Sequence, residues 1–419
     1  MNSIIKTRIE EIKSGKVPSG YKKTKIGIFP LEWEEKRFKT MFCRLQRKNE
    51  ECNTNVLTIS AQYGLINQGD FFNKEVASDD KSNYYLINKG EWTYNKSYSS
   101  GYPFGAIKRL EKYDKGIVSP LYICFSQTQE NKCPDFYLQY FENGLLDKEI
   151  KAIAQEGARN HGLLNLGIDD FFNTLLIVPP VKEQEKIAEI LKTQDRVIEL
   201  KEKLLKEKQR EKKYLMQQLL TGKIRLKGFT GEWEKINVGK VIEEVSFRNS
   251  DGQMRNVMSV SNDRGFIDQS TQFDKIVASK DTTNYKIVTK GIFAYNPSRV
   301  NVGSLALYMD ENESIVSPMY ITFKCNNVED RYLYLWFKSF MFISQLKKYL
   351  SGSVRDSLNI NDLFLFNIAL PGLAEQQAIV KVIMTKDREI ALIKQQIENE
   401  KQKKKALMQL LLSGIVRVS

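Results

Sequence analysis

The chain has 419 residues, a formal net charge of +13 and a hydrophobic content of 42%. This length accommodates two or three domains that each bury a core, and no run of 18 apolar residues or secretory signal predicts a membrane segment. Five cysteines without a Cys-x-x-Cys pair are typical of a reducing cytosol, and a single histidine, His161, argues against a histidine-based metal site or triad. The composition therefore predicts a basic, multidomain cytoplasmic protein.

The positive charge is concentrated in two segments of the chain. Residues 179–226 contain 13 basic and 8 acidic residues, and residues 370–419 contain 9 and 5. The segments 20–178 and 227–369 each carry a net charge of only +1. A polyanion lying along the two basic segments explains this distribution, and a lysine-rich solvated helix face is the alternative explanation.

The N-terminal residues 1–19 are predicted to form a short helical stub. One side of this helix is apolar, and Gly15 ends it. The apolar side consists of Ile4, Ile5, Ile9 and Ile12. Its last turn resembles residues 220–224, which lie at the end of a much longer predicted helix, so we expect the stub to pack beside the long helices.

Residues 20–178 are predicted to form a first α+β domain. Short apolar strands at 56–59, 84–87, 117–118 and 121–123 alternate with turns rich in Gly, Asn and Ser, and a helix is expected from about residue 136. After a long helix, residues 227–369 repeat this pattern. Glu232-Trp233-Glu234 repeats Glu32-Trp33-Glu34, and residues 315–320 repeat residues 117–122. The framework is kept while the loops diverge, which is expected of two recognition domains that read different targets.

Two long helices are predicted at about 183–221 and 375–413. Their sequences align with each other at a constant shift of 192 residues without a gap. The matches include Glu183-Gln184 with Glu375-Gln376, Asp195-Arg196 with Asp387-Arg388, and Leu215-Met216-Gln217 with Leu407-Met408-Gln409. Prolines precede both helices, and Gly222 and Gly414 end them. About 40 residues at ~1.5 Å each give a length of roughly 60 Å.

Each long helix has the 4-3 spacing of a coiled-coil seam. The apolar seam positions are Ile187, Leu191, Ile198, Leu205, Leu215 and Leu219 in the first helix, and Ile379, Ile383, Ile390, Ile397, Leu407 and Leu411 in the second. Polar residues such as Gln194 and Lys386 interrupt both seams. Because neither seam is fully apolar, we expect the helices to pair with each other in antiparallel orientation. A generic structural coiled coil is the alternative.

The order domain, helix, domain, helix predicts a pseudo-twofold α+β architecture: two repeated domains separated by two long antiparallel coiled-coil helices. The predicted segments are residues 1–19 (stub), 20–178 (first domain), 179–226 (central helix), 227–369 (second domain) and 370–419 (C-terminal helix).

At this point the chain resembles the specificity (S) subunit of type I DNA restriction-modification systems. The resemblance is carried by the strand–Pro–helix junctions at 177–184 and 368–376, the Leu-Met-Gln-x-Leu-Leu-[Thr/Ser]-Gly helix ends, and Gly231-Glu232-Trp233-Glu234. It implies two target-recognition domains, each reading half of a split double-stranded DNA sequence. It also implies helices that set the spacing and dock two modification (methyltransferase) subunits, with restriction (helicase-nuclease) subunits joining them. S-adenosylmethionine, ATP and Mg²⁺ would then belong to the partner subunits, and none to this chain.

Catalytic motifs are missing from the sequence. Asn296-Pro297-Ser298-Arg299 lacks the second proline and the aromatic residue of an amino-methyltransferase loop, and no glycine-rich phosphate-binding loop occurs. Asp135 followed by Glu149-Ile150-Lys151 has the spacing of a PD…ExK nuclease site, with Asp330 as the second-domain counterpart of Asp135. Ordinary surface charge is the alternative for these residues. The sequence therefore predicts a non-catalytic subunit without a metal site.

DNA contacts are expected from Arg, Lys, Asn, His and Ser side chains on loops that can enter a groove. The candidates are Arg159, Asn160, His161, Lys108, Arg109, Arg299, Asn301, Arg355 and Ser357. An ordinary loop role is the alternative for each of them, and Asn95 and Asn296, which occur in both domains, are also candidates for turn residues. A coiled-coil scaffold that binds proteins and does not recognise DNA is the rival reading of the whole chain.

Overall fold

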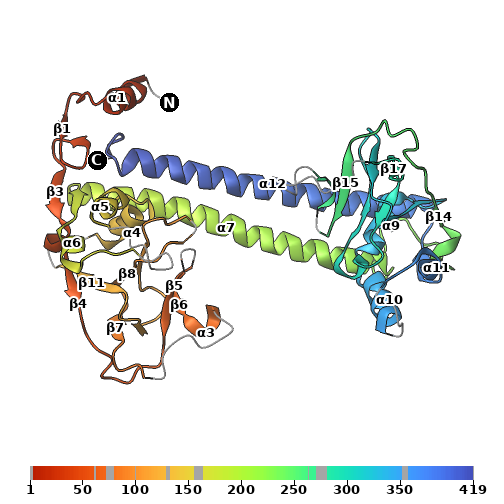
Figure 1. Ribbon diagram of the computed structural model, residues 1–419, viewed down its shortest axis with the longest axis horizontal. Coiled ribbons are helices and arrows are strands. Elements are labelled where there is room, and N and C mark those ends of the chain that lie inside the picture. Colours follow the sequence, from red (N-terminus) through yellow and green to blue (C-terminus); the bar gives the residue numbers. More distant parts are fainter. Residues whose placement is uncertain are drawn as a thin grey trace. The chain divides into compact units, whose positions relative to one another are not determined.

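The computed structural model describes residues 3–60, 63–71, 80–99, 101–128, 133–154, 164–262, 264–269, 281–351 and 357–418. The chain divides into two compact units (Figure 1). The first unit comprises Met1–Leu200 and Ile397–Ser419, and the second comprises Lys201–Gln396. Each unit contains one α+β domain together with a segment of both long helices, and the predicted boundaries along the chain stay predictions.

The first domain is built on a four-stranded antiparallel sheet with the order β4-β11-β8-β9. These strands are β4 (Phe42–Leu45), β11 (Ile123–Gln127), β8 (Trp92–Asn95) and β9 (Ala106–Arg109). Aromatic side chains fill the core beneath the sheet, and Phe38, Phe42, Trp92 and Phe125 are completely buried there. Helices α4 (Pro134–Glu142), α5 (Asp147–Ile153) and α6 (Ile168–Asn173) contribute to the same core.

Smaller strand pairs and short helices complete the first domain. The strand pairs are β1 (Tyr21–Lys23) with β2 (Ile28–Pro30), β3 (Glu34–Arg37) with β12 (Leu175–Val178), β5 (Leu57–Ser60) with β6 (Gly64–Asn67), and β7 (Tyr85–Asn88) with β10 (Lys115–Val118). The short helices are α2 (Phe38–Met41) and α3 (Gln68–Phe71). A parallel bridge between Val56 and Ile117 connects the third and fourth strand pairs.

The second domain repeats this topology. Its main sheet has the order β14-β21-β18-β19, with β14 (Ile242–Glu244), β21 (Ile321–Cys325), β18 (Phe293–Tyr295) and β19 (Leu305–Leu307). A second sheet has the order β16-β15-β20-β17, with β16 (Gly265–Asp268), β15 (Val257–Ser261), β20 (Ser314–Val316) and β17 (Lys286–Val288). The parallel pair Val257–Ile315 within it corresponds to the bridge Val56–Ile117 of the first domain.

The remaining elements of the second domain frame these sheets. They are β13 (Glu234–Asn237), which pairs with β22 (Asn367–Leu370), the 3₁₀ helices η1 (Val238–Lys240) and η2 (Val300–Val302), and α9 (Asp330–Phe337), α10 (Phe340–Ser351) and α11 (Ile360–Phe364). The predicted α+β class with two repeated domains is therefore confirmed.

The long helices are α7 (Val181–Leu220) and α12 (Leu373–Leu411), each within two residues of the predicted bounds. Both begin with the same local hydrogen bond: the side-chain amide of Gln184 donates to the carbonyl of Pro179, and that of Gln376 donates to the carbonyl of Pro371, each at 2.8 Å. Both end at a glycine with positive φ, Gly222 (+68°) and Gly414 (+69°), a conformation that glycine adopts without a Cβ penalty.

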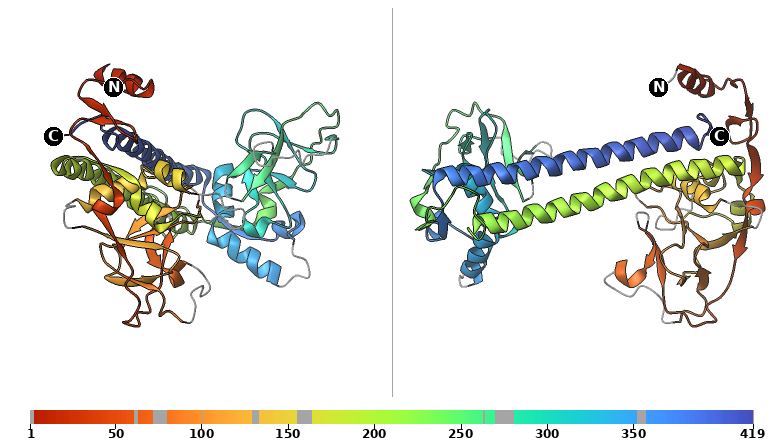
Figure 2. Two further views of the ribbon diagram at one scale, coloured as in Figure 1. Left: turned by 60° about the vertical axis from the view of Figure 1, so that its left-hand side comes forward. Right: turned by 180° about the vertical axis from the view of Figure 1, so that it is seen from behind.

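The two helices run antiparallel (Figure 2). In the first unit Asp195 pairs with Lys404 at 2.6 Å, and Glu183 near the start of α7 pairs with Arg417 beyond the end of α12. In the second unit Lys212 pairs with Asp387 at 2.5 Å. A shift of 192 converts Asp195–Lys404 into Asp387–Lys212, so the two helices exchange roles between the units. Each unit therefore contains the same helix–helix ion pair, with the roles of the two helices exchanged.

The predicted seam positions lie at the helix–helix and helix–domain contacts. Ile187, Leu191, Leu219, Ile379, Ile383, Ile390, Ile397 and Leu411 are buried, and Ile198, Leu205, Leu215 and Leu407 are half-buried. The ends of the seams join the domain cores: Ile187 and Leu191 belong to the first core, and Ile379 and Ile383 to the second. Each domain is therefore continuous with the helix pair that it contacts.

The N-terminal helix α1 (Ser3–Lys13) forms as predicted. On its apolar side Ile5, Ile9 and Ile12 are half-buried and Ile4 is 64% exposed. The guanidinium of Arg8 donates to the carbonyl of Ile415, just beyond the end of α12, at 2.5 Å and lies over the ring of Tyr21. This contact places the stub beside the end of α12, as expected. Among the described residues, each helix is too short or too polar to cross a lipid bilayer.

Candidate functional site

The junction motif at the start of each long helix is an ion-pair anchor. In the first unit Arg417 donates to both carboxylate oxygens of Glu183, from Nε at 2.7 Å and from Nη2 at 2.9 Å, and the indole of Trp33 donates to Glu183 as well. Glu183 is only 4% exposed. A bidentate arginine–carboxylate pair fixes orientation as well as charge. Arg417 thereby attaches the chain after α12 to the first turn of α7.

The second unit repeats this anchor with one difference. Arg225, just beyond α7, donates to both oxygens of Glu375 in the first turn of α12, at 2.5 and 2.7 Å. Arg225 lies over the ring of Trp233, whose indole nitrogen finds no hydrogen-bond partner among the described residues. Hydrogen bonding to the buried glutamates raises the pKa of both arginines. The Glu-Gln motif is visible in the sequence but its anchor role is not, because the arginine partners lie far away in the chain.

Two loops are held together by a backbone hydrogen bond in each domain, and those of the second domain contain predicted DNA contacts. In the second domain the amide of Leu358 donates to the carbonyl of Pro297 at 3.1 Å, which places Ser357 beside the loop 296–299. In the first domain the amide of Leu164 donates to the carbonyl of Lys96 at 3.0 Å. We call each arrangement the paired loops of its domain: residues 95–97 with 164 in the first, and residues 296–301 with 357–358 in the second.

The shared asparagines of the paired loops are turn residues. The side-chain oxygen of Asn95 accepts from the amide of Ser97 at 3.0 Å, and that of Asn296 accepts from the amide of Ser298 at 3.1 Å. This Asx turn is a common way for asparagine to fix a loop backbone. The two positions are alike because both domains need the same turn.

The neighbours of Asn296 are available to solvent. Arg299 and Asn301 are both exposed, and neither side chain makes a hydrogen bond or ion pair with another described residue. The 3₁₀ helix η2 between Arg299 and Gly303 holds them on a tight turn, which Gly303 completes with φ +98°. Backbone hydrogen bonds hold the turn, and the side chains of Arg299 and Asn301 are exposed to solvent. The other predicted contacts of this kind, Arg159, Asn160, His161 and Arg355, lie outside the described residues.

Lys108 and Arg109 have a different environment from the one expected for DNA contacts. Lys108 is 5% exposed and its ammonium pairs with Glu142 and the hydroxyl of Tyr102. Arg109 pairs with Asp135 at 2.7 Å. Burial raises the pKa of Asp135, but the hydrogen bonds and charges of Arg109 and Lys192 outweigh burial and hold that pKa below its ordinary value. Acidic side chains of the same domain neutralise both cations, so neither is a candidate for the DNA interface.

The residues of the nuclease-like pattern do not converge. Asp135 lies on α4 and Glu149 on α5, where Glu149 accepts a hydrogen bond from the amide of Leu175 at 3.1 Å. Counted from the helix starts at Pro134 and Asp330, Asp135 corresponds to Arg331, so the expected counterpart Asp330 is wrong. Within the part of the chain that the structure describes, no three His, Cys, Asp or Glu side chains gather at one point.

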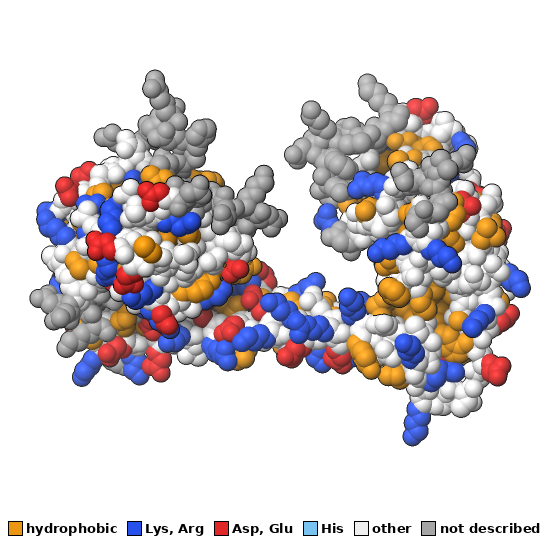
Figure 3. Space-filling model, turned by 90° about the horizontal axis from the view of Figure 1, so that it is seen from below, with side chains coloured by type: hydrophobic (Ala, Val, Ile, Leu, Met, Phe, Trp, Pro, Cys, Tyr) orange, Lys and Arg blue, Asp and Glu red, His pale blue; other side chains and the backbone are white. Residues whose placement is uncertain are grey.

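Basic side chains cover the exposed parts of the long helices (Figure 3). Acidic side chains are interspersed among them. Large apolar side chains are exposed there too, namely Leu200 (49%), Leu204 (42%) and Leu392 (55%). Leu200 and Leu392 are equivalent at the shift of 192. The helix surfaces thus combine charge with equivalent apolar positions.

Comparison with known proteins places these features in a family. The sequence model described as "Type I restriction modification DNA specificity domain" matches residues 30–209 and 262–401, more than half of the chain. Two relatives come from Methanocaldococcus jannaschii. The MjaX type I restriction enzyme specificity subunit is 23% identical over 95% of this chain and 97% of its own length. The MjaVIII specificity subunit is 24% identical over 73% of this chain and 75% of its own length.

Solved structures share the fold. A chain from a study of complex assembly and conformational transition of the type I R-M system aligns with a TM-score of 0.57 at 16% identity, covering 93% of this chain and 99% of that one. The HsdS subunit from Thermoanaerobacter tengcongensis aligns with a TM-score of 0.50 at 17% identity, covering 93% and 98%. The S subunit from M. genitalium gives 0.50 at 13% identity, covering 90% and 96%.

The anchors generate a stability prediction. Arg225→Gln should lower the free energy of unfolding, because it leaves the buried carboxylate of Glu375 without its partner. Adding Glu375→Gln should recover part of this loss. Chemical denaturation of the four proteins of this double-mutant cycle measures the coupling. Arg196→Gln breaks an exposed ion pair with Glu199 and serves as the control, with an expected change within about 0.5 kcal/mol. Equal effects of Arg225→Gln and Arg196→Gln would contradict the anchor role.

Proposed function

This chain belongs to the type I restriction modification DNA specificity family, and on that premise we propose that it reads a two-part DNA target, one half with each domain, while its helices set the distance and dock two methyltransferase subunits. The observation that carries the proposal is the pair of equivalent hydrogen bonds, Leu164 to Lys96 and Leu358 to Pro297. They hold the same two loops together in both domains, although the loop sequences differ. A common scaffold with different side chains is what two independent half-site readers require.

The paired loops of the second domain suit base recognition. Arg299 and Asn301 are exposed on a turn fixed by Asn296 and Gly303, so their side chains can reach a groove without a backbone change. Arginine reads guanine and asparagine reads adenine through bidentate hydrogen bonds in the major groove. Ser357, at the edge of the same loops, is a third candidate. By the same reasoning from sequence, Arg159, Asn160, His161 and Arg355 are proposed contacts.

The long helices suit a docking and spacing role. Their buried seams and end anchors restrict bending and sliding, and Leu200, Leu204 and Leu392 present apolar surface outward. Leu200 and Leu204 are one turn apart and lie on the same face of α7, which suits contact with an apolar side chain of a partner protein. Because Leu200 and Leu392 are equivalent, they suit two copies of one partner. The rival reading as a scaffold without DNA recognition accounts for the helices but not for the paired loops.

We propose no chemistry in this chain. Adenine methylation with S-adenosylmethionine would belong to the docked methyltransferase subunits, and ATP- and Mg²⁺-dependent cleavage to restriction subunits. The support is the absence of the corresponding motifs from the sequence, together with the internal pairing of Asp135 by Arg109 and Lys192.

The independence of the two domains can be tested by exchange. Replacing residues 20–178 with the corresponding domain of a relative that reads another target should change one half of the methylated sequence and leave the other half intact. Methylation sequencing of DNA treated with the chimeric subunit and the methyltransferase gives the answer. Changes in both halves would show that the domains do not read independently.

Arg299 provides a test of base contact. Arg299→Ala should weaken specific DNA binding by about 1–3 kcal/mol, roughly fivefold to 150-fold, and relax one position of the half-site. A gel-shift titration combined with selection from random sequences measures both effects. Arg255→Ala removes an exposed arginine elsewhere in the same domain and is the matched control. An equal loss for all sequences would identify Arg299 as a phosphate contact instead.

The spacing role predicts the effect of a longer helix pair. One heptad inserted between Leu200 and Lys201 and a second between Gln396 and Ile397 keep the seam in register. Seven residues add about 10.5 Å, or roughly 3 base pairs at ~3.4 Å each. We expect a target with a longer spacer and reduced activity, because 3 base pairs also rotate the groove by about 100°. Methylation sequencing decides, and an unchanged spacer at full activity would refute the spacing role.

A further inference from the structure

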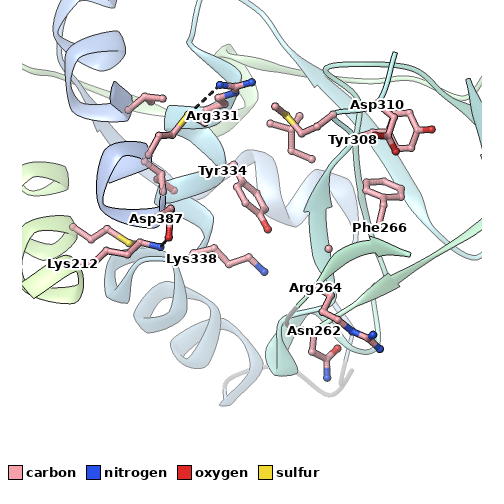
Figure 4. A pocket seen from close by; sticks show the side chains of 17 residues that line it. Lys212, Asn262, Arg264, Phe266, Tyr308, Asp310, Arg331, Tyr334, Lys338 and Asp387 are labelled. Atoms are coloured by element: carbon pink, nitrogen blue, oxygen red, sulfur yellow. Dashed lines mark hydrogen bonds and ion pairs between the residues drawn. The ribbon is translucent and has the colours of Figure 1, made fainter. Parts of the chain in front are cut away.

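A crevice of about 580 Å³ opens in the second unit between α9, the strands β16 and β19, and the segments of α7 and α12 in that unit (Figure 4). Its apolar surface includes Met216, Met309 and Met384, three of the ten methionines of the chain, together with Phe266. Met309 is 38% exposed. Methionine is flexible and polarizable, and it is frequent at surfaces that adapt to a bound polypeptide.

Three cations of the crevice form no salt bridge among the described residues, although the charge of Arg331 acts on the nearby carboxyl of Glu329. Lys338 donates to the carbonyls of Gly303 and Leu305, and burial lowers its pKa. Arg331 donates to the sulfur of Met384 at 3.0 Å, a weak acceptor for a guanidinium. Arg264 extends from the other side of the space in Figure 4. The guanidinium groups of Arg264 and Arg331 retain most of their donors for an anion, and the ammonium of Lys338 retains one.

The first unit has a crevice at the equivalent place. Its volume is about 400 Å³, and it contains the helix ion pair Asp195–Lys404, which corresponds to Asp387–Lys212 in the second crevice. Gly64 lines the first crevice and Gly265 the second, each at the start of the second strand of a hairpin. The two crevices therefore occupy the same position in the repeat.

Their chemistry differs at these equivalent positions. Counted from the starts of α4 and α9, Glu142 of the first crevice corresponds to Lys338 of the second. Counted from the paired strands β8–β9 and β18–β19, Glu111 corresponds to Met309. In the first crevice Glu142 neutralises Lys108, whereas Lys338 has no acidic neighbour to pair with among the described residues. The charges of the first crevice balance. The second contains the carboxylates of Asp310 and Asp387 but has two more basic than acidic lining residues, together with its methionines.

We propose that the crevice of the second unit binds an acidic polypeptide segment carrying a large apolar side chain, supplied by the methyltransferase subunit. This inference rests on the proposed function, which brings that subunit to the helices. Carboxylates of the segment would pair with Arg264, Arg331 and Lys338, and its apolar side chain would lie among the methionines. The subunit would thus be bound through a contact that the first unit does not offer.

The apolar surface favours polypeptide over DNA as the occupant. A DNA backbone supplies anions for the three cations but no comparable side chain to cover Met309 and Phe266. A peptide segment with a carboxylate next to a leucine or phenylalanine can pair with the cations and cover the apolar surface at the same time.

Photo-crosslinking tests the proposal on the full complex. p-Benzoylphenylalanine at position 309 should crosslink to the methyltransferase subunit, and mass spectrometry should map the crosslink to an Asp/Glu-rich segment with an apolar residue. The same group at Met319, which is 59% exposed in the same domain, should give at most a tenth of that yield. Arg264→Gln combined with Arg331→Gln should reduce the yield at position 309 about tenfold, and Arg255→Gln should leave it unchanged.

The outcomes separate the two proposals. If the complex assembles and methylates DNA but position 309 crosslinks to DNA, to a basic segment or to nothing, the crevice proposal fails while the proposed function stands. If no complex with the methyltransferase subunit forms, both fail. A crosslink to an acidic, apolar segment that the double variant abolishes supports the crevice proposal.

Discussion

Both domains depend on the antiparallel pairing of α7 and α12. Glu183 lies in the first turn of α7 and pairs with Arg417, which follows α12. Glu375 lies in the first turn of α12 and pairs with Arg225, which follows α7. The glutamates are buried, so their charge is tolerated only while the arginine is present. Seam residues at both helix ends enter the domain cores. Neither domain can therefore separate from its helix pair without exposing apolar surface and an unpaired carboxylate.

This construction allows one framework to carry two different surfaces. The main sheets, the parallel strand contact and the Asx turns are the same in both domains. Packing and backbone hydrogen bonds depend on those features, which restricts how they can change. Side chains that point away from the framework are free of this restriction. Glu111 and Met309 occupy equivalent positions, and so do Glu142 and Lys338, although their chemistry is opposite.

The two domains differ in whole groups of interacting residues. In the first domain Lys108 and Glu142 neutralise each other, as do Arg109 and Asp135. In the second domain the equivalents of Asp135 and Lys192 are Arg331 and Met384, so the acidic partner and one cation are both gone. A half-buried charge without an acidic partner is costly unless a ligand supplies one. Arg331 and Lys338 stand where the first domain has Asp135 and Glu142, and these new cations are the feature of the second domain that most favours an acidic partner.

Sequence periodicity was sufficient to predict the two long helices, their ends and their duplication, because seam spacing, proline and glycine signals and repeats are local patterns. It also predicted the repeated α+β domains. It did not predict the arginine partners of Glu183 and Glu375, or the pairing of Lys108 with Glu142 and of Arg109 with Asp135. Each of these depends on which residues from distant parts of the chain become neighbours. A lysine on a strand looks the same in the sequence whether it faces solvent or a buried glutamate, and only the packing of α4 against β9 assigned Lys108 to Glu142.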